Sequence, residues 1–367
     1  MRLMFVYWRI GNAGSAQDIL QYARVAKSLG HEVVIYAPEE PGSPFQCSLD
    51  LAPADAVIFV FEWNLYSFPG GDKKKGRVYR DGLMGIGHLN VARLFSRVPR
   101  DRRVILDCDG MYNDPTQVRG DFNHLDVEAS CRRTELCESI SDKIFQPTYR
   151  PLRPNVRPFM FHAYDPLWEK PLVFSHKDYG MIYVGNNWFR WKAMHRVLRA
   201  IEPIREKVGR AVLVGQDWAA MPSWVPSPLR EQAYFTDPEY LKGLGVELRE
   251  PIPVEQVIPT MGTAIFNPVL MRPLFDHLGL VTCRTFETPA ASTIPLFTQD
   301  PEYVASIYGD RAMELVLRDG DAATEQILDV LRRPEEFTEI VHDIRRHLAE
   351  KHSYAVRFQE LVRIVAE

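Results

Sequence analysis

The sequence predicts two successive doubly wound α/β domains, and three observations predict this fold class. The chain has 367 residues, more than one ordinary hydrophobic core accommodates. A strand–loop–helix–strand pattern occupies the N-terminal region and starts again near residue 180, which is typical of parallel α/β units. Between the two patterns, residues 147–180 are rich in proline and lack periodicity, so we expect the connection between the domains there.

The first pattern alternates strands with loops and helices. The apolar run RLMFVYW precedes a Gly/Asn/Ser loop, and a helical pattern then ends at Gly30. The segment HEVVIYAP and residues 54–63, 102–110 and 142–147 are interpreted as buried strands. Polar residues end each strand, as expected where ligand groups gather at the carboxyl edge of a parallel sheet. Residues 64–82 are rich in glycine and basic residues, which predicts a long surface loop over a cleft.

The second pattern repeats this organisation. YGMIYVG predicts a strand, NNWFRWKAMHRVLRAIEPIREKVG a loop and a helix, and RAVLVG the next strand. GVELREPIP and GTAIFNP predict two more strands, LVTCRTFETPAA a strand or loop that enters a helix, and TIPLF another strand. The tail from Ala322 onward has helical periodicity. We therefore expect a second parallel sheet followed by helices.

Composition limits the classes of protein that fit the chain. Its 46% apolar and 25% charged residues are typical of a globular protein. The net charge of −4, with scattered basic residues, disfavours a general nucleic-acid surface, although a local basic groove stays open. Five irregularly spaced cysteines form no C-x-x-C pair, which disfavours disulfides and structural zinc. A reducing compartment fits this cysteine usage best.

The sequence also carries no pattern for export or membrane insertion. The apolar run at the N-terminus is too short for a signal peptide. No window approaches the roughly 18 apolar residues that a membrane-spanning helix needs. We therefore expect a cytoplasmic protein without a membrane span.

The first candidate site is the loop GNAGSAQD. Gly11, Asn12, Gly14 and Ser15 allow a ligand close to the backbone, and the N–H groups of the following helix favour an anion. The loop lacks the glycine order of a dinucleotide fingerprint. It is interpreted either as a phosphate or acceptor loop, or as a tight turn in which Ser15 or Asp18 caps the helix.

The second candidate site is the segment YVGNNWFRWK. Gly185, Asn186 and Asn187 follow a strand, and Arg190 and Lys192 come at the start of a helix. Two cations at that place oppose the helix dipole, and a bound diphosphate would reverse the sign of this interaction. The alternative is that both are surface cations of an amphipathic helix.

The third candidate site is Glu287, in the stretch CRTFETPAASTIPLF. It is a carboxylate among small and apolar residues at the expected start of a helix, and a carboxylate can accept hydrogen bonds from both hydroxyls of a ribose. Arg284 and Thr285, with the helix amides, could take a phosphate. The alternative is that Glu287 pairs internally with Arg284.

The fourth candidate site is a set of acids at strand ends in the first half. Glu62, Asp107 and Asp109 each follow an apolar run, and one of them could act as general base toward a reacting hydroxyl. His162 and Asp165 lie near the hinge, in FHAYDPLW, and His162 is assigned with the loop GNAGSAQD to acceptor or phosphate binding. The alternative is that each acid caps a turn. Motifs of serine hydrolases, zinc hydrolases and P-loop enzymes are absent from the sequence, which disfavours those classes.

The motifs of the second and third candidate sites, together with other segments of the second half, resemble the C-terminal half of GT-B glycosyltransferases of the group-1 type. YVGNN, the helix with Lys192, VLVGQDW, RTFETPAAS, PLF and KHSYAVRFQELV follow one another over residues 180–362. Their order and spacing are similar to those of the branch related to the spore maturation protein CgeB. The first half of the chain resembles the family in its α/β pattern and in HAYDPLW.

The resemblance implies two Rossmann-like domains that face each other across a cleft. Residues 1–165 would form the acceptor domain, residues 166–345 the nucleotide-sugar donor domain, and residues 346–367 a helix that crosses back to the first domain. The implied reaction moves a sugar from a nucleotide diphosphate, such as a UDP-sugar, to an acceptor hydroxyl. The nucleotide sugar is a co-substrate, and neither a cofactor nor a metal is implied because cations and a helix dipole stabilise the leaving diphosphate.

The resemblance also assigns roles to individual residues. Glu287 would hold the donor ribose, and Arg190 and Lys192 the diphosphate. The donor-binding residues implied are Gly185, Asn186, Asn187, Arg190, Lys192, Gly215, Arg284, Thr285, Phe286 and Glu287.

Two residues depart from the family pattern. Ser292 stands where the family has a glycine, which predicts a closer or shifted approach of the backbone to the donor. Leu280 and Gly279 occupy the places of an earlier acid found in retaining members, which bears on the contact to the sugar.

Two other functional classes stay open, a GT-B nucleotide-sugar epimerase and a non-catalytic sugar-nucleotide-binding protein. The expected acceptor is a small molecule or a glycan. The net acidity disfavours a nucleic acid, although a DNA-base glucosylating enzyme of similar fold stays open.

Overall fold

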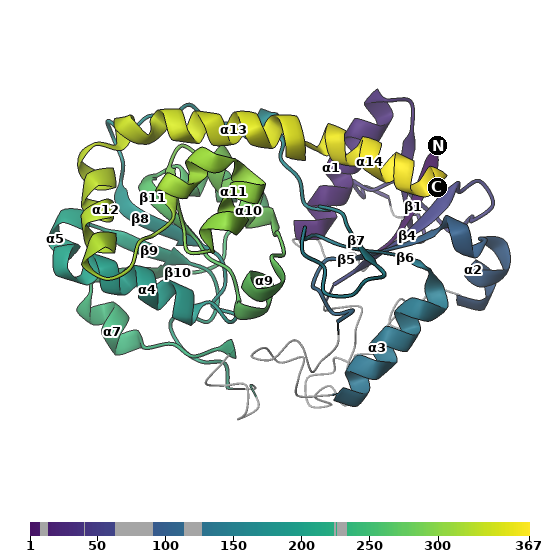
Figure 1. The fold of residues 1–367 in the computed structure, drawn as a ribbon, viewed down its shortest axis with the longest axis horizontal. Helices are drawn as coiled ribbons and strands as arrows, with labels where there is room; N and C mark the ends of the chain where they lie inside the picture. The colour runs from purple at the N-terminus through teal and green to yellow at the C-terminus, as the bar shows by residue number, and fades with distance from the viewer. Residues whose placement is uncertain (8–13, 40, 63–90, 114–126, 224, 226–232) are drawn as a thin grey trace. The chain divides into compact units, whose positions relative to one another are not determined.

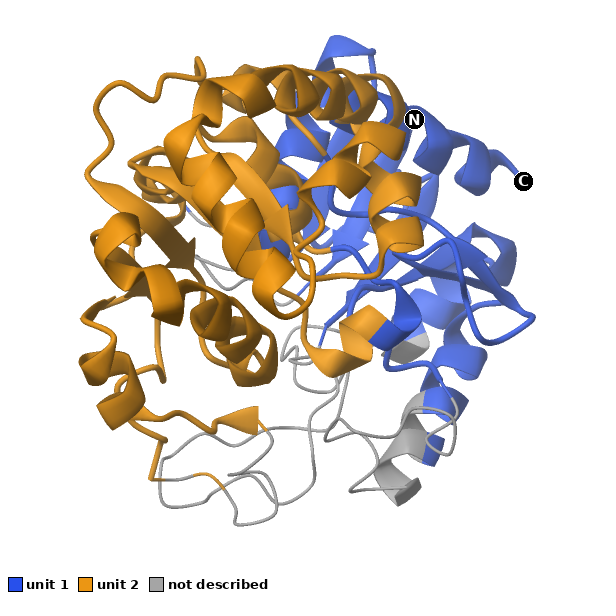
Figure 2. Ribbon diagram, turned by 60° about the vertical axis from the view of Figure 1, so that its left-hand side comes forward, with its two compact units in different colours: residues 1–163, 277–281, 354–367 blue, residues 164–276, 282–353 orange. Residues whose placement is uncertain are grey.

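The structure is a computed structural model, and the residues it describes fall into two compact units (Figures 1 and 2). Described are residues 1–7, 14–39, 41–62, 91–113, 127–223, 225 and 233–367. Unit 1 comprises residues 1–163, 277–281 and 354–367, and unit 2 comprises residues 164–276 and 282–353. The expected surface loop at 64–82 lies outside the described residues.

The described residues of unit 1 form a seven-stranded parallel sheet with the order β3-β2-β1-β4-β5-β6-β7. The strands are β1 (Arg2–Val6), β2 (Glu32–Tyr36), β3 (Cys47–Ser48), β4 (Ala56–Phe61), β5 (Arg103–Asp107), β6 (Lys143–Gln146) and β7 (Val156–Pro158). Every residue of β4 and β5 is buried, as the apolar runs of a parallel sheet covered on both faces require. The strands predicted in the first half are thus confirmed.

The sequence does not predict β3 and β7. Both are short edge strands, too short for apolar periodicity to reveal. Pro158 is tolerated in β7 because an edge strand need not donate every backbone hydrogen bond. Since β7 lies within residues 147–180, part of the expected hinge belongs to the sheet of unit 1.

The helices of unit 1 include one from the far end of the chain (Figure 1). They are α1 (Gly14–Ser28), α2 (Val91–Arg97), α3 (Val127–Ile140) and α14 (Tyr354–Ala366). α14 packs on α1, where the rings of Tyr354 and Phe358 lie 5.3 Å and 6.5 Å from that of Tyr22. The expected boundary at residue 346 falls inside α13 (Thr338–His352), which belongs to unit 2, and the chain leaves that helix at the extended Ser353.

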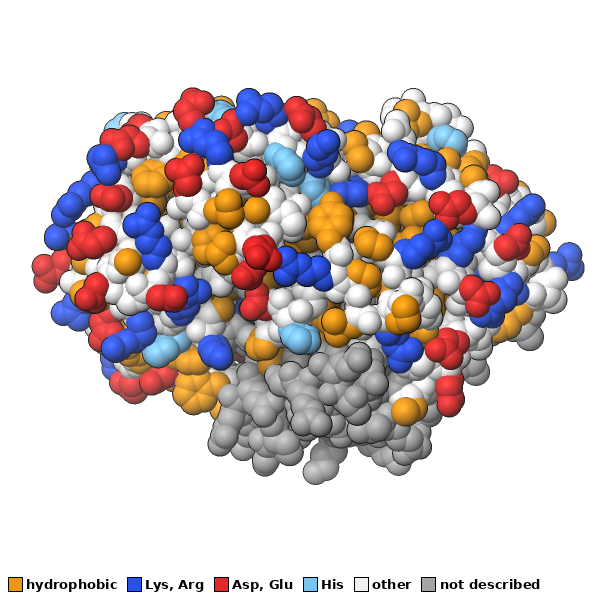
Figure 3. All heavy atoms as spheres, in the orientation of Figure 1, with side chains coloured by type: hydrophobic (Ala, Val, Ile, Leu, Met, Phe, Trp, Pro, Cys, Tyr) orange, Lys and Arg blue, Asp and Glu red, His pale blue; other side chains and the backbone are white. Residues whose placement is uncertain are grey.

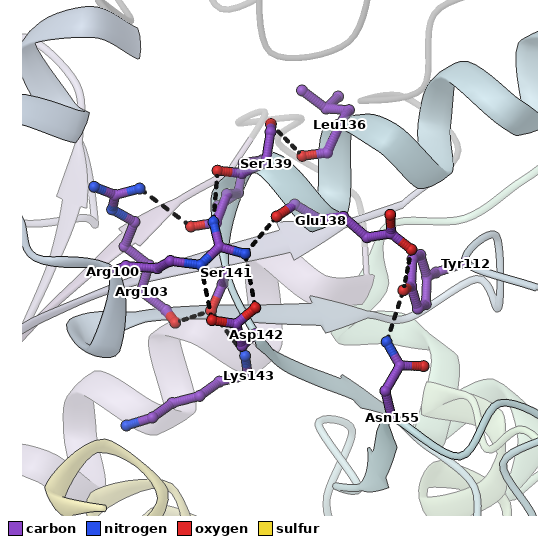
Figure 4. A network of polar contacts seen from close by, with 11 residues as sticks. Arg100, Arg103, Tyr112, Leu136, Glu138, Ser139, Ser141, Asp142, Lys143 and Asn155 are labelled. Atoms are coloured by element: carbon purple, nitrogen blue, oxygen red, sulfur yellow. Dashed lines mark hydrogen bonds and ion pairs between the residues drawn. The ribbon is translucent and has the colours of Figure 1, made fainter.

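Two arginines fasten the helices of unit 1 to the sheet (Figure 4). Arg100 donates to both carboxylate oxygens of Asp142, at 2.8 Å and 2.7 Å, and to the Ser139 carbonyl at the end of α3. The buried Arg103 donates to the carbonyls of Val98, at 2.9 Å, and Ile140, at 3.3 Å. Guanidinium groups satisfy carbonyls that a helix end leaves unpaired. These bonds fix both helices around β5, whose carboxyl end carries the candidate acids.

The described residues of unit 2 form a five-stranded parallel sheet with the order β10-β9-β8-β11-β12. The strands are β8 (Tyr179–Val184), β9 (Ala211–Val214), β10 (Val246–Arg249), β11 (Ala264–Val269) and β12 (Ile294–Phe297). These are the strands predicted in the second half, and the segment before residue 283 is a loop that enters a helix.

Helices cover this second sheet (Figure 1). They are α4 (Trp191–Ile201), α5 (Arg205–Val208), α7 (Pro238–Gly243), α8 (Val257–Met261), α9 (Pro273–Leu278, which crosses the unit boundary at residue 277), α10 (Cys283–Ala290), α11 (Pro301–Tyr308), α12 (Asp321–Arg332) and α13. The predicted helical tail is confirmed as α12, α13 and α14. Within the described part of the chain, no helix is long and apolar enough to cross a membrane.

Candidate functional site

The loops after β8 and β9 touch at the carboxyl edge of the unit 2 sheet. The Gly185 N–H donates to the Val214 carbonyl at 2.8 Å. Gly215 has φ of +146°, and a Cβ at this position would lie 2.4 Å from the Gly185 carbonyl oxygen. Position 215 therefore requires glycine, both for its backbone conformation and for the close approach.

The two asparagines after Gly185 join these loops. Asn186 is exposed, and its Oδ1 accepts from the Gln216 N–H at 2.9 Å. Asn187 is fully buried, and its Nδ2 donates to the carbonyls of Asp217 at 3.1 Å and Phe235 at 2.8 Å. Asn187 therefore builds the loop, whereas Asn186 lies at its surface.

The predicted cations begin α4. Arg190 is the half-buried residue before the first turn, and its Nη1 donates to the Asn186 carbonyl at 3.1 Å. Lys192 is exposed in the first turn. Burial raises the pKa of the Tyr183 phenol in β8, and the positive charges of Arg190 and Arg284 act in the opposite direction. Both guanidinium groups are therefore close enough to the end of β8 to act on one buried group.

Glu287 and Arg284 lie on α10 and form an ion pair. The Glu287 side chain is only 10% exposed. Arg284 also donates from Nε to the Val184 carbonyl at the end of β8, at 2.7 Å. The pairing that the sequence left as an alternative is thus present, and it places the carboxylate and a cation beside the Gly185 loop.

Two other predicted donor residues have structural roles. Thr285 is fully buried, and its hydroxyl accepts from the Thr282 N–H at 3.0 Å, which closes the first turn of α10. Phe286 is fully buried, with its ring 5.9 Å from that of His352. Neither side chain offers surface to a ligand in this structure.

Ser292 lies away from this edge of the sheet. It precedes β12, so it stands at the amino edge, whereas Gly185 and Gly215 stand at the carboxyl edge. Its hydroxyl accepts from the Val173 N–H at 3.1 Å and from Lys177 Nζ at 3.1 Å. The Ser292 side chain thus fastens the residue 173–177 segment, and its expected effect on the approach to a donor stays a prediction.

Among the acids of unit 1, Asp107 anchors a turn. It is fully buried and accepts from the N–H groups of Met111 at 3.0 Å and Tyr112 at 2.8 Å, and from Gln146 Nε2 at 2.8 Å. Burial raises its pKa to about 6, although these hydrogen bonds oppose the shift. Asp107 matches the turn-capping alternative and does not face solvent as a base would.

Glu62 follows β4 and is half-buried. Its carboxylate accepts from the Tyr7 hydroxyl at 2.9 Å and from the Ser15 hydroxyl. Burial, and next the negative charge of Asp109, raise the pKa of Glu62 to about 7. The half-buried Asp109 is therefore close enough for its charge to act on Glu62.

The predicted N-terminal loop is described only in part. Gly11 and Asn12 lie outside the described residues, and Gly14 and Ser15 are the first two residues of α1. Because Ser15 donates to Glu62, its hydroxyl links α1 to the end of β4.

His162 belongs to a buried chain of polar groups that the sequence does not predict. Its Nδ1 lies 2.7 Å from Asp18 Oδ2, and the Tyr354 hydroxyl donates to Asp18 Oδ1. Burial lowers the pKa of His162, but the carboxylates of Asp18, Glu62 and Asp109 raise it more, so the net shift is upward. The sequence offered one signal for this chain, since Tyr354 lies within KHSYAVRFQELV.

These residues form two separate groups, one in each unit. In unit 2, the structure brings Gly185, Asn186, Arg190, Gly215, Arg284 and Glu287 to the carboxyl edge of the sheet. In unit 1, it brings Ser15, Glu62, Asp109 and His162 together. Among the described residues, no cluster of His, Cys, Asp and Glu could hold a metal ion.

Comparison with known proteins decides the fold. One similar solved structure is an α-glucosyltransferase in complex with UDP and a 13-mer DNA. It superposes with a TM-score of 0.61 and 13% sequence identity, and the match covers 100% of this chain and 99% of that chain. T4 phage BGT in complex with UDP-glucose superposes with a TM-score of 0.56 and 12% sequence identity. T4 phage BGT in complex with UDP and Mn²⁺ superposes with a TM-score of 0.59 and 14% sequence identity, and both matches cover 100% of each chain. The chain has the GT-B fold.

Comparison of the sequence with protein families gives a match. Residues 195–363 match the family described as glycosyl transferase-like. This match covers the part of the chain that holds α10 and most of unit 2. No curated protein matches the sequence.

Proposed function

We propose that this GT-B protein transfers a sugar from a UDP-sugar to an acceptor hydroxyl. The observation that carries the proposal is Arg284, which bridges the end of β8 and the nearly buried Glu287. A carboxylate with remaining lone pairs can accept both hydroxyls of a ribose, and a charge-assisted bond of this kind contributes about 1.5–3 kcal/mol. Similar solved structures contain UDP or UDP-glucose, which supports uridine as the nucleoside.

The cations of unit 2 suit a leaving diphosphate. Arg190 and Arg284 both act on the buried Tyr183 phenol, so their charges converge at the end of β8. The N–H groups at the start of α4 add a positive potential. Negative charge that develops on the diphosphate as the glycosidic bond breaks is stabilised by such groups without a metal. One similar structure contains Mn²⁺, so addition of a chelator tests metal independence directly.

We assign the base to Glu62, with Asp109 as the neighbour that tunes it. Glu62 is half-buried and has a pKa of about 7, which suits proton removal near neutral pH. Two hydrogen bonds to its carboxylate leave lone pairs for an incoming hydroxyl. Glu62 would take the acceptor proton as the acceptor oxygen bonds to the anomeric carbon and UDP leaves with the bonding electrons.

The acceptor is proposed by chemistry alone, as a hydroxyl of a small molecule or a glycan. On the face shown in Figure 3, acidic and basic side chains are interspersed, in keeping with the net charge of −4. A second candidate is a hydroxyl on a DNA base, because similar solved structures include an α-glucosyltransferase with DNA containing an HMU base. Assignment to the CgeB-like branch rests on RTFETPAAS and KHSYAVRFQELV.

Calorimetric binding of UDP tests the donor assignment. The wild-type chain should bind UDP, and Glu287→Ala should weaken binding about 10- to 100-fold because the ribose loses a charge-assisted partner. Glu255→Ala, an exposed glutamate of the same unit, should bind as the wild type does. Equal affinity of Glu287→Ala and wild type would remove the ribose contact from the proposal.

A further inference from the structure

Arg345 lies on α13, and its guanidinium is buried at the end of α10, within unit 2. Its side chain is 4% exposed. Nε donates to the Pro289 carbonyl at 2.7 Å, and Nη2 donates to the carbonyls of Ala291 at 2.9 Å and Ala290 at 3.3 Å. Nη1 donates to the Lys170 carbonyl at 2.9 Å. One side chain thus satisfies the last carbonyls of the helix that carries Glu287.

Arg345 shares the end of α10 with two backbone donors, because the Lys170 N–H donates to the Ala290 carbonyl and the Thr293 N–H to the Ala291 carbonyl, each at 2.9 Å. The helix has eight residues, about two turns, which is too short to be stable by local hydrogen bonds alone. Pro289 lies inside its last turn and has no N–H to donate to the preceding turn. The Pro289 carbonyl takes a donor from Arg345 Nε, and a buried carbonyl that loses its donor is costly.

The position of α10 sets the position of the candidate donor groups. At its start, Arg284 is bonded to the Val184 carbonyl of β8. At its end, Arg345 holds Pro289, Ala290 and Ala291. Glu287 lies between these two attachments, three residues before Ala290.

We propose that Arg345 is a positioning residue for donor binding, acting through α10 on Glu287 and Arg284. This inference rests on the proposed function, which places the ribose and diphosphate of the donor at those two side chains. Arg345 itself lies at the far end of the helix from Arg284 and acts without touching the ligand.

The chemistry of the site requires arginine. A guanidinium presents five N–H donors in a planar fork, so it reaches several carbonyls at once, whereas an ammonium is a single point. Its positive charge also suits the negative end of the helix dipole. Burial lowers the pKa of Arg345, and the neighbouring Tyr164 and Glu169 act in the opposite direction. Arginine remains charged at neutral pH in such settings.

The test measures α10 and ligand binding separately in the full chain. Arg345→Lys and Arg345→Met are compared with Arg346→Met, a neighbour on α13 whose exposed side chain pairs with Asp343. Hydrogen–deuterium exchange of peptides covering residues 283–291 should rise in both Arg345 variants, more in Met than in Lys, and stay at the wild-type level in Arg346→Met. The Kd for UDP, measured well below the unfolding temperature, should rise about tenfold or more in Arg345→Met.

A double-mutant cycle separates positioning from general destabilisation. In the Glu287→Ala background, Arg345→Lys should raise the Kd for UDP less than it does in the wild-type background, because both changes affect the same contact. If Arg345→Met does not fold, Arg345→Lys and this cycle decide the result.

Each outcome bears on one proposal or the other. Faster exchange in α10 with an unchanged Kd for UDP would overturn the positioning role and leave Arg345 as a residue that only stabilises the fold. Unchanged exchange in α10 would overturn it as well. If the wild type itself binds no UDP, the proposed function fails, and the exchange of α10 then still shows whether Arg345 holds the helix.

Discussion

Glu62 and Asp107 are both acids at the end of neighbouring strands, yet their surroundings give them different roles. Asp107 has backbone and amide donors on both oxygens and is fully buried. Glu62 has two hydroxyl donors and is only half-buried beside Asp109. The sequence predicts acids at both places because each follows an apolar run. It cannot predict the difference, since the donors come from a later turn and from other elements.

The base assignment predicts a pH dependence for sugar transfer. Glu62 must be deprotonated to act, so kcat/KM should fall as the pH drops below about 7, the pKa of this carboxyl in the folded protein. Asp109→Asn should move this limb to lower pH, because the charge of Asp109 raises the pKa of Glu62. Glu62→Gln should lower the rate about 10²- to 10⁴-fold. A rate profile of Glu62→Gln that matches wild type would assign the base elsewhere.

Asp107 is expected to matter for stability. Asp107→Ala leaves the N–H groups of Met111 and Tyr112 and the amide of Gln146 without their acceptor in the interior. We expect a loss of about 1–3 kcal/mol or more in the free energy of unfolding, measured by denaturant titration. A variant as stable as wild type but inactive would instead favour a role for Asp107 in the reaction.

At the scale of elements, long apolar strands and the terminal helices are predictable, whereas short edge elements are not. β8 and β4 are continuous apolar runs, which the sequence marks clearly. β3 and β7 are too short for any periodicity, and the two-residue β3 depends on pairing with β2. The contact between the Gly185 and Gly215 loops also depends on which strands become neighbours, which the sequence motif alone does not specify.

The contact between those loops gives a prediction. In Gly215→Ala, the new Cβ would meet the Gly185 carbonyl oxygen at 2.4 Å, and alanine rarely adopts φ of +146°. We expect a lower unfolding temperature and a weaker affinity for UDP, by calorimetry. Gly243→Ala is the matched control in the same unit, because a Cβ there has no described atom within 4 Å. A Gly215→Ala chain with wild-type affinity would show that this loop contact does not shape the donor site.

At the scale of the whole molecule, the C-terminal helix completes the first unit rather than the second. α14 packs on α1, and Tyr354 reaches the buried Asp18. The family resemblance predicts that the last helix packs on the first domain. The structure shows that Tyr354 makes this contact, with Tyr22 and Asp18. α13 continues to His352 with its apolar residues buried, and unit 1 resumes at Tyr354, whereas the resemblance implies a boundary at residue 346.

The role of α14 predicts unequal effects on the two units. Phe358 is fully buried and lies near the rings of Tyr22 and His31, so Phe358→Ala should cost about 3–5 kcal/mol. Scanning calorimetry should show a lower transition for unit 1, while UDP still raises the transition of unit 2. Gln359→Ala, at an exposed position of α14, should leave both transitions unchanged. A loss of UDP stabilisation in Phe358→Ala would contradict a donor site confined to unit 2.

The central claim is that the protein moves a sugar from a UDP-sugar to an acceptor hydroxyl. The most direct measurement is UDP release from a panel of UDP-sugars by the wild-type chain, with and without a panel of hydroxyl-bearing acceptors that includes glycans and DNA with hydroxymethylated bases. The account predicts that one UDP-sugar is cleaved, that an acceptor accelerates UDP release, and that the sugar appears on that acceptor in equal amount. Interconversion of UDP-sugars without any UDP release, in the presence of every acceptor, would contradict it.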